Sequence, residues 1–159
     1  MRFTIDEAAR ATGGSFSIDP VNDQTEITSL TWDSRNVEPG ALYVALPGER
    51  EDGHAFAAAA VAAGAVCVLA QHALDQASAD EIAAAGAAVI QVPDTQAAVT
   101  ALARAWRDRL EGRVIGITGS TGKTTTKNLV RDVLAAAGSV CATKGNQNNE
   151  LGVPNTVLA

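Results

Sequence analysis

The spacing of hydrophobic and polar residues predicts an alternation of strands and helices along most of the chain. Short apolar runs rich in β-branched residues, such as Val114–Ile117, are typical of strands that a parallel sheet buries on both faces. Segments in which apolar residues recur every three or four positions are typical of helices with one buried face. This alternation, which begins at Ala41, predicts the α/β fold class.

The predicted elements can be placed along the chain by their turn and capping residues. We predict strands over residues 1–4, 15–18, 26–32, 41–46, 65–70, 87–92, 114–117 and 139–143. We predict helices over residues 5–11, 55–63, 79–85 and 94–110, one from the glycine turn to residue 137, and one that begins at Val153-Pro154. A new strand–helix pattern begins after Pro93, which suggests a domain boundary there.

A glycine-rich turn connects the predicted strand Val114–Ile117 to the helix that follows it. The turn is Thr118-Gly119-Ser120-Thr121-Gly122-Lys123-Thr124-Thr125. Glycines let several backbone N–H groups point inward, and the helix N-terminus adds partial positive charge. In such a phosphate-binding loop, Lys123 would reach the outer phosphates and the Thr124 hydroxyl would hold Mg²⁺. The strict pattern requires glycine where Ile117 stands, so a purely structural glycine turn is the alternative.

Three other polar stretches are candidate binding segments. Asp33-Ser34-Arg35 ends a predicted strand and offers a hydroxyl and a guanidinium to a diphosphate, although this stretch taken alone favours a turn with a local salt bridge. Leu46–Glu49 with Asp52-Gly53-His54 is either a ligand loop or a plain strand–helix connection capped by Asp52. The segment Gly145–Pro154 carries amides that suit sugar hydroxyls and phosphates, or that form a surface loop.

Composition and charge limit the possible functions. The 159 residues suffice for one domain or two small ones, and with 47% hydrophobic but 4% aromatic residues the core must consist of alanine, valine and leucine. A net charge of −6 without a basic cluster argues against nucleic-acid binding. No apolar run approaches the roughly 20 residues that span a bilayer, and the N-terminus lacks the basic-then-apolar pattern expected of a signal segment. Cys67 and Cys141 are expected to be reduced and buried, which favours the cytoplasm.

Together these motifs resemble a known family, the Mur ligases. Thr31–Arg35, Pro39–Gly48 and Asp52–His54 resemble the N-terminal domain of that family. Gly116–Thr124 looks like its ATP loop, and the family shares the glycine offset that places Ile117 outside the strict pattern. The segment Gly145–Pro154 is similar to one found in the family member that adds D-alanyl-D-alanine.

The resemblance implies a fold and an activity. It implies a small N-terminal α/β domain that binds a UDP-linked substrate (residues 1–92), followed by the first part of a P-loop parallel-sheet ATPase domain (residues 93–159). The implied reaction is ATP-dependent amide-bond formation in peptidoglycan precursor synthesis. The γ-phosphate of ATP is transferred to the carboxylate of a UDP-N-acetylmuramoyl-tripeptide, and the amine of D-alanyl-D-alanine then displaces phosphate from the acyl phosphate. A monomer is expected.

The resemblance also implies roles for individual residues. Lys123 and Thr124 would be catalytic, with Thr124 holding Mg²⁺, and ATP would be bound by Thr118, Gly119, Ser120, Thr121, Gly122, Lys123, Thr124 and Thr125. The UDP substrate would be bound by Ser34, Arg35, Glu49, Asp52, His54, Asn146, Asn148 and Asn149.

Other interpretations remain open. Only 35 residues follow Thr124, whereas a phosphate-loop domain needs further strands and an acidic Mg²⁺ ligand, so we expect a fragment that does not ligate by itself. The main alternatives are a sister ligase that adds the third amino acid and a non-catalytic UDP-sugar-binding module. A folylpolyglutamate synthetase is disfavoured by the N-terminal motif, and an α/β domain with a structural glycine turn is the simplest alternative.

Overall fold

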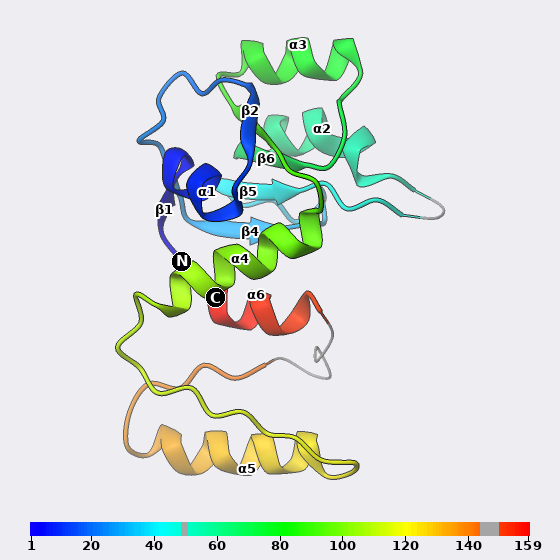
Figure 1. Ribbon diagram of the computed structural model, residues 1–159. Coiled ribbons are helices and arrows are strands. Elements are labelled where there is room, and N and C mark those ends of the chain that lie inside the picture. Colours follow the sequence, from blue (N-terminus) through cyan, green and yellow to red (C-terminus); the bar gives the residue numbers. More distant parts are fainter. Residues whose placement is uncertain (49–50, 144–149) are drawn as a thin grey trace.

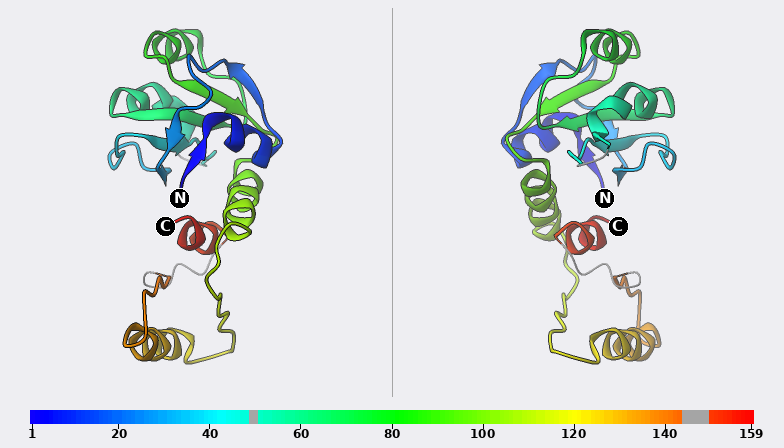
Figure 2. Two further views of the ribbon diagram at one scale, coloured as in Figure 1. Left: turned by 90° about the vertical axis from the view of Figure 1, so that its left-hand side faces the viewer. Right: turned by 90° about the vertical axis from the view of Figure 1, so that its right-hand side faces the viewer.

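The computed structural model describes residues 1–48, 51–143 and 150–159, and it divides into a packed α/β part and an extended part (Figure 1). We call the packed part, residues 1–107 together with the helix at residues 152–158, the body. We call residues 110–143 the arm. Figure 2 shows that the arm extends from the side of the body that carries the helices at residues 95–107 and 152–158.

The body is built on a five-stranded sheet with the strand order β2-β7-β6-β5-β4. Strands β4 (Ser29–Thr31), β5 (Ala41–Val44), β6 (Ala65–Ala70) and β7 (Ala88–Gln91) are parallel, and β2 (Ser15–Ile18) pairs antiparallel with β7. The central strands are apolar on both faces, as buried parallel strands must be. The α/β class that the sequence predicted is therefore confirmed.

Helices cover both faces of the sheet. Helices α1 (Ile5–Thr12) and α4 (Thr95–Arg107) pack on one face, with the small sheet of β1 (Phe3–Thr4) and β3 (Glu26–Ile27) beside them. Successive strand residues alternate between the two cores, so this face takes Leu42, Val44, Leu69 and Ile90.

The opposite face of the sheet carries the second core. Helices α2 (Ala57–Ala62) and α3 (Gln76–Ala84) bury Ala60, Val61 and Ile82 against it. The strand residues that meet them are Tyr43, Val68 and Val89. Many of these core residues are alanine or valine, as the composition predicted.

Capping residues begin α1 and α4 where the sequence predicted them, whereas α3 begins earlier. Thr4 and Glu7 form the predicted capping box of α1. Asp94 accepts hydrogen bonds from the first backbone N–H groups of α4 at 2.8 and 3.0 Å. Helix α3 begins three residues earlier than predicted because Asp75 caps it through the N–H and hydroxyl of Ser78.

The predicted strand over residues 26–32 is wrong as a single element. It divides into β3, which pairs with β1, and β4, which pairs with β5. Thr28 lies at the division, and its N–H donates to Gly40 O at 3.0 Å. One continuous sequence pattern therefore supplies strands to two different sheets. The predicted helix over residues 55–63 likewise divides, into the 3₁₀ helix η1 (Gly53–Phe56) and α2.

The helix predicted to begin at Val153-Pro154 is α6 (Gly152–Leu158), and it packs against α4 (Figures 1 and 2). Leu158 is buried in the first core, and its carbonyl accepts a hydrogen bond from the Met1 ammonium at 3.0 Å. The position of a domain boundary near Pro93 remains a prediction, and α4, which follows it, buries its apolar face in the body.

The arm departs most from the prediction. The predicted strands over residues 114–117 and 139–143 do not form, because within the described residues neither has a neighbouring strand to pair with. Helix α5 (Lys123–Ala135) forms but buries none of its residues. Cys141 is exposed, contrary to prediction, whereas Cys67 is buried and its burial raises the pKa of the thiol to about 12.

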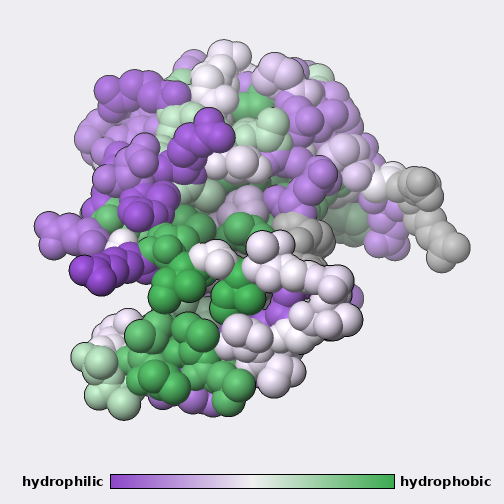
Figure 3. Space-filling model, turned by 60° about the horizontal axis from the view of Figure 1, so that its bottom comes forward, coloured by the Kyte–Doolittle hydropathy of each residue, from purple (hydrophilic) through white to green (hydrophobic). Residues whose placement is uncertain are grey.

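Apolar side chains of the arm consequently lie in solvent. Val114 is 62% exposed and Val133 is 72% exposed. Figure 3 shows hydrophobic side chains gathered on the lower part of the molecule, which comes forward in that view. A shallow apolar hollow of the arm is lined by Ile115, Leu129, Val130, Val133 and Leu134.

Candidate functional site

The glycine turn of the arm leads directly into α5. Gly119 has a φ of +149° and Gly122 has a φ of +77°, values that side-chain-bearing residues rarely adopt. Gly122 is the N-cap of α5 and provides no side-chain cap for the N–H groups of the first turn. These donors, with the positive end of the helix dipole, make the turn suited to an anion.

Lys123 is the first residue of α5, and its ammonium donates to the carbonyl of Gly119 across the turn. The lysine side chain therefore bends back over the turn rather than extending into solvent. Thr124 and Thr125 follow in the first turn of the helix and are exposed. The predicted residues Thr118 to Thr125 thus form one continuous turn and helix start, although the strand predicted to precede them is absent from the described residues.

The other candidate residues lie where the parallel strands end. We call the carboxyl ends of β4, β5, β6 and β7, with the residues that follow them, the sheet edge. In open α/β sheets, ligands bind outside this edge. Asp33-Ser34-Arg35 follows β4, and Asp52 and His54 follow β5. The residues that follow β6 and β7 make up the rest of the sheet edge.

The turn after β4 is held by a salt bridge. Asp33 accepts from Arg35 Nε at 2.8 Å and from Arg35 Nη2 at 2.9 Å, and also from the Arg35 backbone N–H at 3.1 Å. These hydrogen bonds from the Arg35 side chain hold the pKa of Asp33 well below its usual range. The Arg35 side chain is 85% exposed, so its guanidinium is oriented by Asp33 and also accessible to a ligand. Ser34 lies between them and is half-buried.

The loop after β5 closes on itself before η1 begins. Gly53 N–H donates to Leu46 O at 2.9 Å, and Tyr43 Oη donates to Gly53 O at 2.9 Å. A Cβ at Gly53 would lie 2.7 Å from Leu46 O, so this close approach requires glycine. Glu49 falls within this loop but outside the described residues, as do Asn146, Asn148 and Asn149 in the segment before α6.

Asp52 and His54 lie together at the start of η1. The His54 ring is 4% exposed, and its Nδ1 lies 2.6 Å from Asp52 Oδ1. The backbone N–H of His54 also donates to that oxygen, at 3.0 Å. These bonds, the backbone bond first, lower the pKa of Asp52 to about 2.

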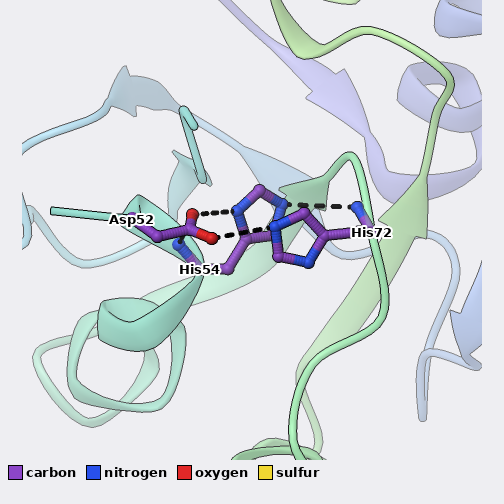
Figure 4. Close-up of side chains that lie close together, drawn as sticks. All are labelled: Asp52, His54 and His72. Atoms are coloured by element: carbon purple, nitrogen blue, oxygen red, sulfur yellow. Dashed lines mark hydrogen bonds and ion pairs between the residues drawn. The ribbon is translucent and has the colours of Figure 1, made fainter. Parts of the chain in front are cut away.

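Sequence reasoning missed the residues of the sheet edge that follow β6 and β7. His72 stacks on His54 with ring centroids 3.6 Å apart, and its Nε2 lies 2.9 Å from Asp52 Oδ2 (Figure 4). Gln71 and Thr95 also take part in this hydrogen-bonded region. Gln71 and His72 come directly after a fully apolar predicted strand. Their position at the sheet edge could therefore have been predicted from the sequence.

Two family models match parts of this chain. The family model described as "Mur ligase family, catalytic domain" matches residues 26–107, and the model "Mur ligase middle domain" matches residues 117–159. The chain belongs to the Mur ligase family. The first match covers the sheet edge, and the second covers the glycine turn and α5.

Individual relatives and solved structures of the family are similar to most of this chain. The UDP-N-acetylmuramoyl-tripeptide–D-alanyl-D-alanine ligase of Bacillus subtilis is 40% identical over 98% of this chain, which covers 33% of that protein. The crystal structure of MurF from Acinetobacter baumannii superimposes with a TM-score of 0.84 and 35% identity over 99% of this chain and 33% of that one. MurF from Thermotoga maritima, solved in complex with ADP, gives a TM-score of 0.70 and 32% identity over 83% of this chain and 29% of that one.

The chain spans about a third of the length of the curated relatives it matches. Among the helices of the described residues, none combines the length and the apolar character that crossing a bilayer requires.

Proposed function

We propose that this chain supplies the UDP-substrate and ATP sites of an ATP-dependent ligase of peptidoglycan precursor synthesis, the enzyme that joins D-alanyl-D-alanine to UDP-N-acetylmuramoyl-tripeptide. The observation that carries this proposal is the extent of the similarity to relatives of that name, which includes both the sheet edge and the glycine turn. A protein that uses ATP to activate a UDP-linked substrate needs both sites in one molecule. We place the reaction in the cytoplasm and expect a monomer.

The glycine turn is the proposed ATP site. The first N–H groups of α5 lack a side-chain cap, and Lys123 lies over the turn, so donors for phosphate oxygens converge there. Residues Thr118 to Thr125 would surround the phosphates, and Lys123 would exchange the Gly119 carbonyl for a phosphate oxygen. Thr124 would hold Mg²⁺, an ion that offsets negative charge on transferring phosphates when it is bound.

The sheet edge is the proposed site for the UDP-linked substrate. Arg35 carries an oriented, exposed guanidinium, whose planar donors match phosphate oxygens. Ser34 would add a hydroxyl, and Asp52 would form part of the same surface. Glu49, Asn146, Asn148 and Asn149 belong to this proposal on the sequence alone.

The chemistry explains why both sites are needed. A carboxylate is a poor electrophile, so an oxygen of the tripeptide carboxylate first attacks the γ-phosphorus of ATP, and the bond to ADP breaks. The amine of D-alanyl-D-alanine then attacks the carbonyl carbon of the acyl phosphate, phosphate leaves, and the amine gives up a proton. Lys123 and the N–H groups of the turn would stabilise the charge that moves onto the phosphate oxygens.

Separate titrations test this proposal on the 159-residue chain. We expect UDP-N-acetylmuramoyl-tripeptide and Mg-ATP each to bind, as measured by isothermal titration calorimetry. Arg35→Ala should weaken the UDP substrate about tenfold or more and leave Mg-ATP unaffected, because a hydrogen bond to a charged group is worth about 1.5–3 kcal/mol. Asn36→Ala, in the same turn, is the matched control.

The titrations also separate the main alternative. The complete core of the body favours a UDP-sugar-binding module as the second candidate, and binding of the UDP substrate without Mg-ATP would support it. A chain that binds neither ligand would contradict both proposals.

A further inference from the structure

Three polar side chains meet between the ends of β5 and β6. Figure 4 shows the Asp52 carboxylate beside the stacked rings of His54 and His72. Each carboxylate oxygen faces one ring nitrogen, Oδ1 facing His54 Nδ1 at 2.6 Å and Oδ2 facing His72 Nε2 at 2.9 Å. The His54 ring is buried and the His72 ring is half-exposed.

The surroundings of the His54 ring define its proton position. Its Nε2 lies 2.9 Å from the backbone nitrogen of Gln71 and 3.4 Å from that of His72, and both of these are donors. His54 Nε2 must therefore accept and cannot carry a hydrogen. The hydrogen resides on Nδ1, where the Asp52 carboxylate accepts it.

The same three side chains could instead hold a metal ion, because their ligand atoms lie within 4.8 Å of one another. A metal on His54 Nδ1 would move the ring hydrogen to Nε2, where it would face the N–H of Gln71. Two donors would then oppose each other in a buried place, which costs free energy. The backbone therefore favours a hydrogen-bonded arrangement over a metal site.

The hydrogen bonds continue from Gln71 to α4. The Gln71 side-chain oxygen accepts from Thr95 N–H at 3.3 Å and from Thr95 Oγ1 at 3.4 Å, and Thr95 is fully buried. The hydrogen-bonded path Asp52–His54–Gln71–Thr95 joins the connections that follow β5, β6 and β7. Three neighbouring strand ends of the sheet edge are thus linked by a hydrogen-bonded path in which His54 and Thr95 are buried.

We propose that His54, as its neutral Nδ1–H tautomer, is a positioning residue that fixes these three connections relative to one another at the sheet edge. It acts through Gln71 and Asp52, since both ring nitrogens are already bonded and the ring is buried. The effect on substrate binding rests on the proposed function, in which the UDP-linked substrate occupies this edge. The tautomer itself does not depend on any ligand.

The first test measures the tautomer in the wild-type chain. The sequence contains only two histidines, so ¹⁵N NMR of the rings is assigned by comparison with His72→Asn. We expect the hydrogen of His54 on Nδ1, an unprotonated Nε2 and slow exchange of the Gln71 amide. A hydrogen on Nε2, or stoichiometric Zn²⁺ binding that shifts the signals of both rings, would overturn the proposal.

The second test uses two substitutions that each keep half of the ring chemistry. His54→Gln places a carbonyl oxygen near the position of Nε2 and keeps the acceptor for Gln71, whereas His54→Asn keeps a donor for Asp52 and loses that acceptor. We expect His54→Asn to speed exchange of the Gln71 amide and to lower the affinity for the UDP substrate about tenfold, with the affinity for Mg-ATP unchanged. His54→Gln should keep both the amide exchange rate and the affinity for the UDP substrate close to those of the wild-type chain.

The outcomes separate the two proposals. Equal behaviour of His54→Asn and His54→Gln, in amide exchange and in affinity, would contradict the positioning role even if the UDP substrate binds. A wild-type chain with the expected tautomer that does not bind the UDP substrate would contradict the proposed function alone. If either variant fails to fold, the ring signals of the wild-type chain still decide the tautomer.

Discussion

The body and the arm have similar sequence patterns but very different packing. In the body, Val68 and Ile90 belong to strands that are paired on both sides, and both residues are fully buried. In the arm, Ile115 is 58% exposed, although Val114–Ile117 has the pattern of a buried strand. Helix α5 likewise buries no residue, although its sequence has the pattern of an amphipathic helix. The comparison shows that a pattern records which residues tend to be buried, whereas burial itself requires neighbours from distant parts of the sequence.

Core truncations should reveal this difference most strongly. We expect Leu69→Ala, in β6, to lower the free energy of unfolding by about 2–5 kcal/mol, because it leaves a cavity in a closed core. Leu129→Ala, in α5, should change it by no more than about 0.5 kcal/mol, because that side chain is 62% exposed. Urea denaturation followed by circular dichroism measures both. Equal losses would contradict the distinction between body and arm.

A charge removed from the arm should affect ligand binding and leave stability unchanged. Lys123→Ala should weaken Mg-ATP about 10- to 100-fold, in line with the loss of one charge-assisted hydrogen bond. The melting temperature should stay the same, because the hydrogen bond that the Lys123 ammonium makes in the described residues goes to Gly119, within the turn itself. Arg131→Ala, farther along the same helix, is the matched control. Unchanged affinity in the Lys123 variant would support a purely structural glycine turn.

The two helix starts offer a smaller contrast. Asp94→Ala removes the side chain that caps α4 and should cost about 1 kcal/mol of stability. Gly122→Ala, at the uncapped start of α5, introduces a Cβ at a φ of +77°. It should weaken Mg-ATP binding, since the turn is distorted, and leave unfolding of the body unchanged. Thermal unfolding and calorimetry separate the two effects, and a stability loss in both variants would contradict them.

Acid should affect the body through Asp52. Its pKa falls from 3.8 to about 2 on folding, so its ionised form stabilises the folded state above about pH 4. That contribution is lost as the pH falls from about 3.8 to about 2. Asp52→Asn should therefore show a shallower decline of stability across this interval, measured by denaturation at several pH values. The same decline in both proteins would refute the assignment to Asp52.

Local features of the fold were predictable because they depend on neighbouring residues. The capping box at Thr4, the cap at Asp94 and the glycine turn before α5 each arise within a few positions, and all form as predicted. The split between β3 and β4 was not predictable, because both parts have strand character and only their distant partners differ. The unformed strands of the arm were missed for the same reason.

The candidate site divides along the same line. Arg35 and Lys123 stand in short motifs that predict phosphate contacts, and those roles remain predictions. Gln71, His72 and Thr95 have no motif, and only the topology of the sheet brings them to the same edge. Their place after consecutive parallel strands is the physical rule that connects them.

Within the described residues, contacts with the body are found at both ends of the arm. Where α4 ends, the Arg109 guanidinium bonds to Glu7 and lies 4.7 Å from the Phe3 ring centroid, and where the chain returns, α6 packs against α4. A segment held at one end can swing in any direction, but one held at both ends rotates mainly about the line through its two anchors. We therefore expect any movement of the glycine turn relative to the sheet edge to be mainly a hinge-like swing about the line from Arg109 to Gly152, the buried residue at which α6 begins.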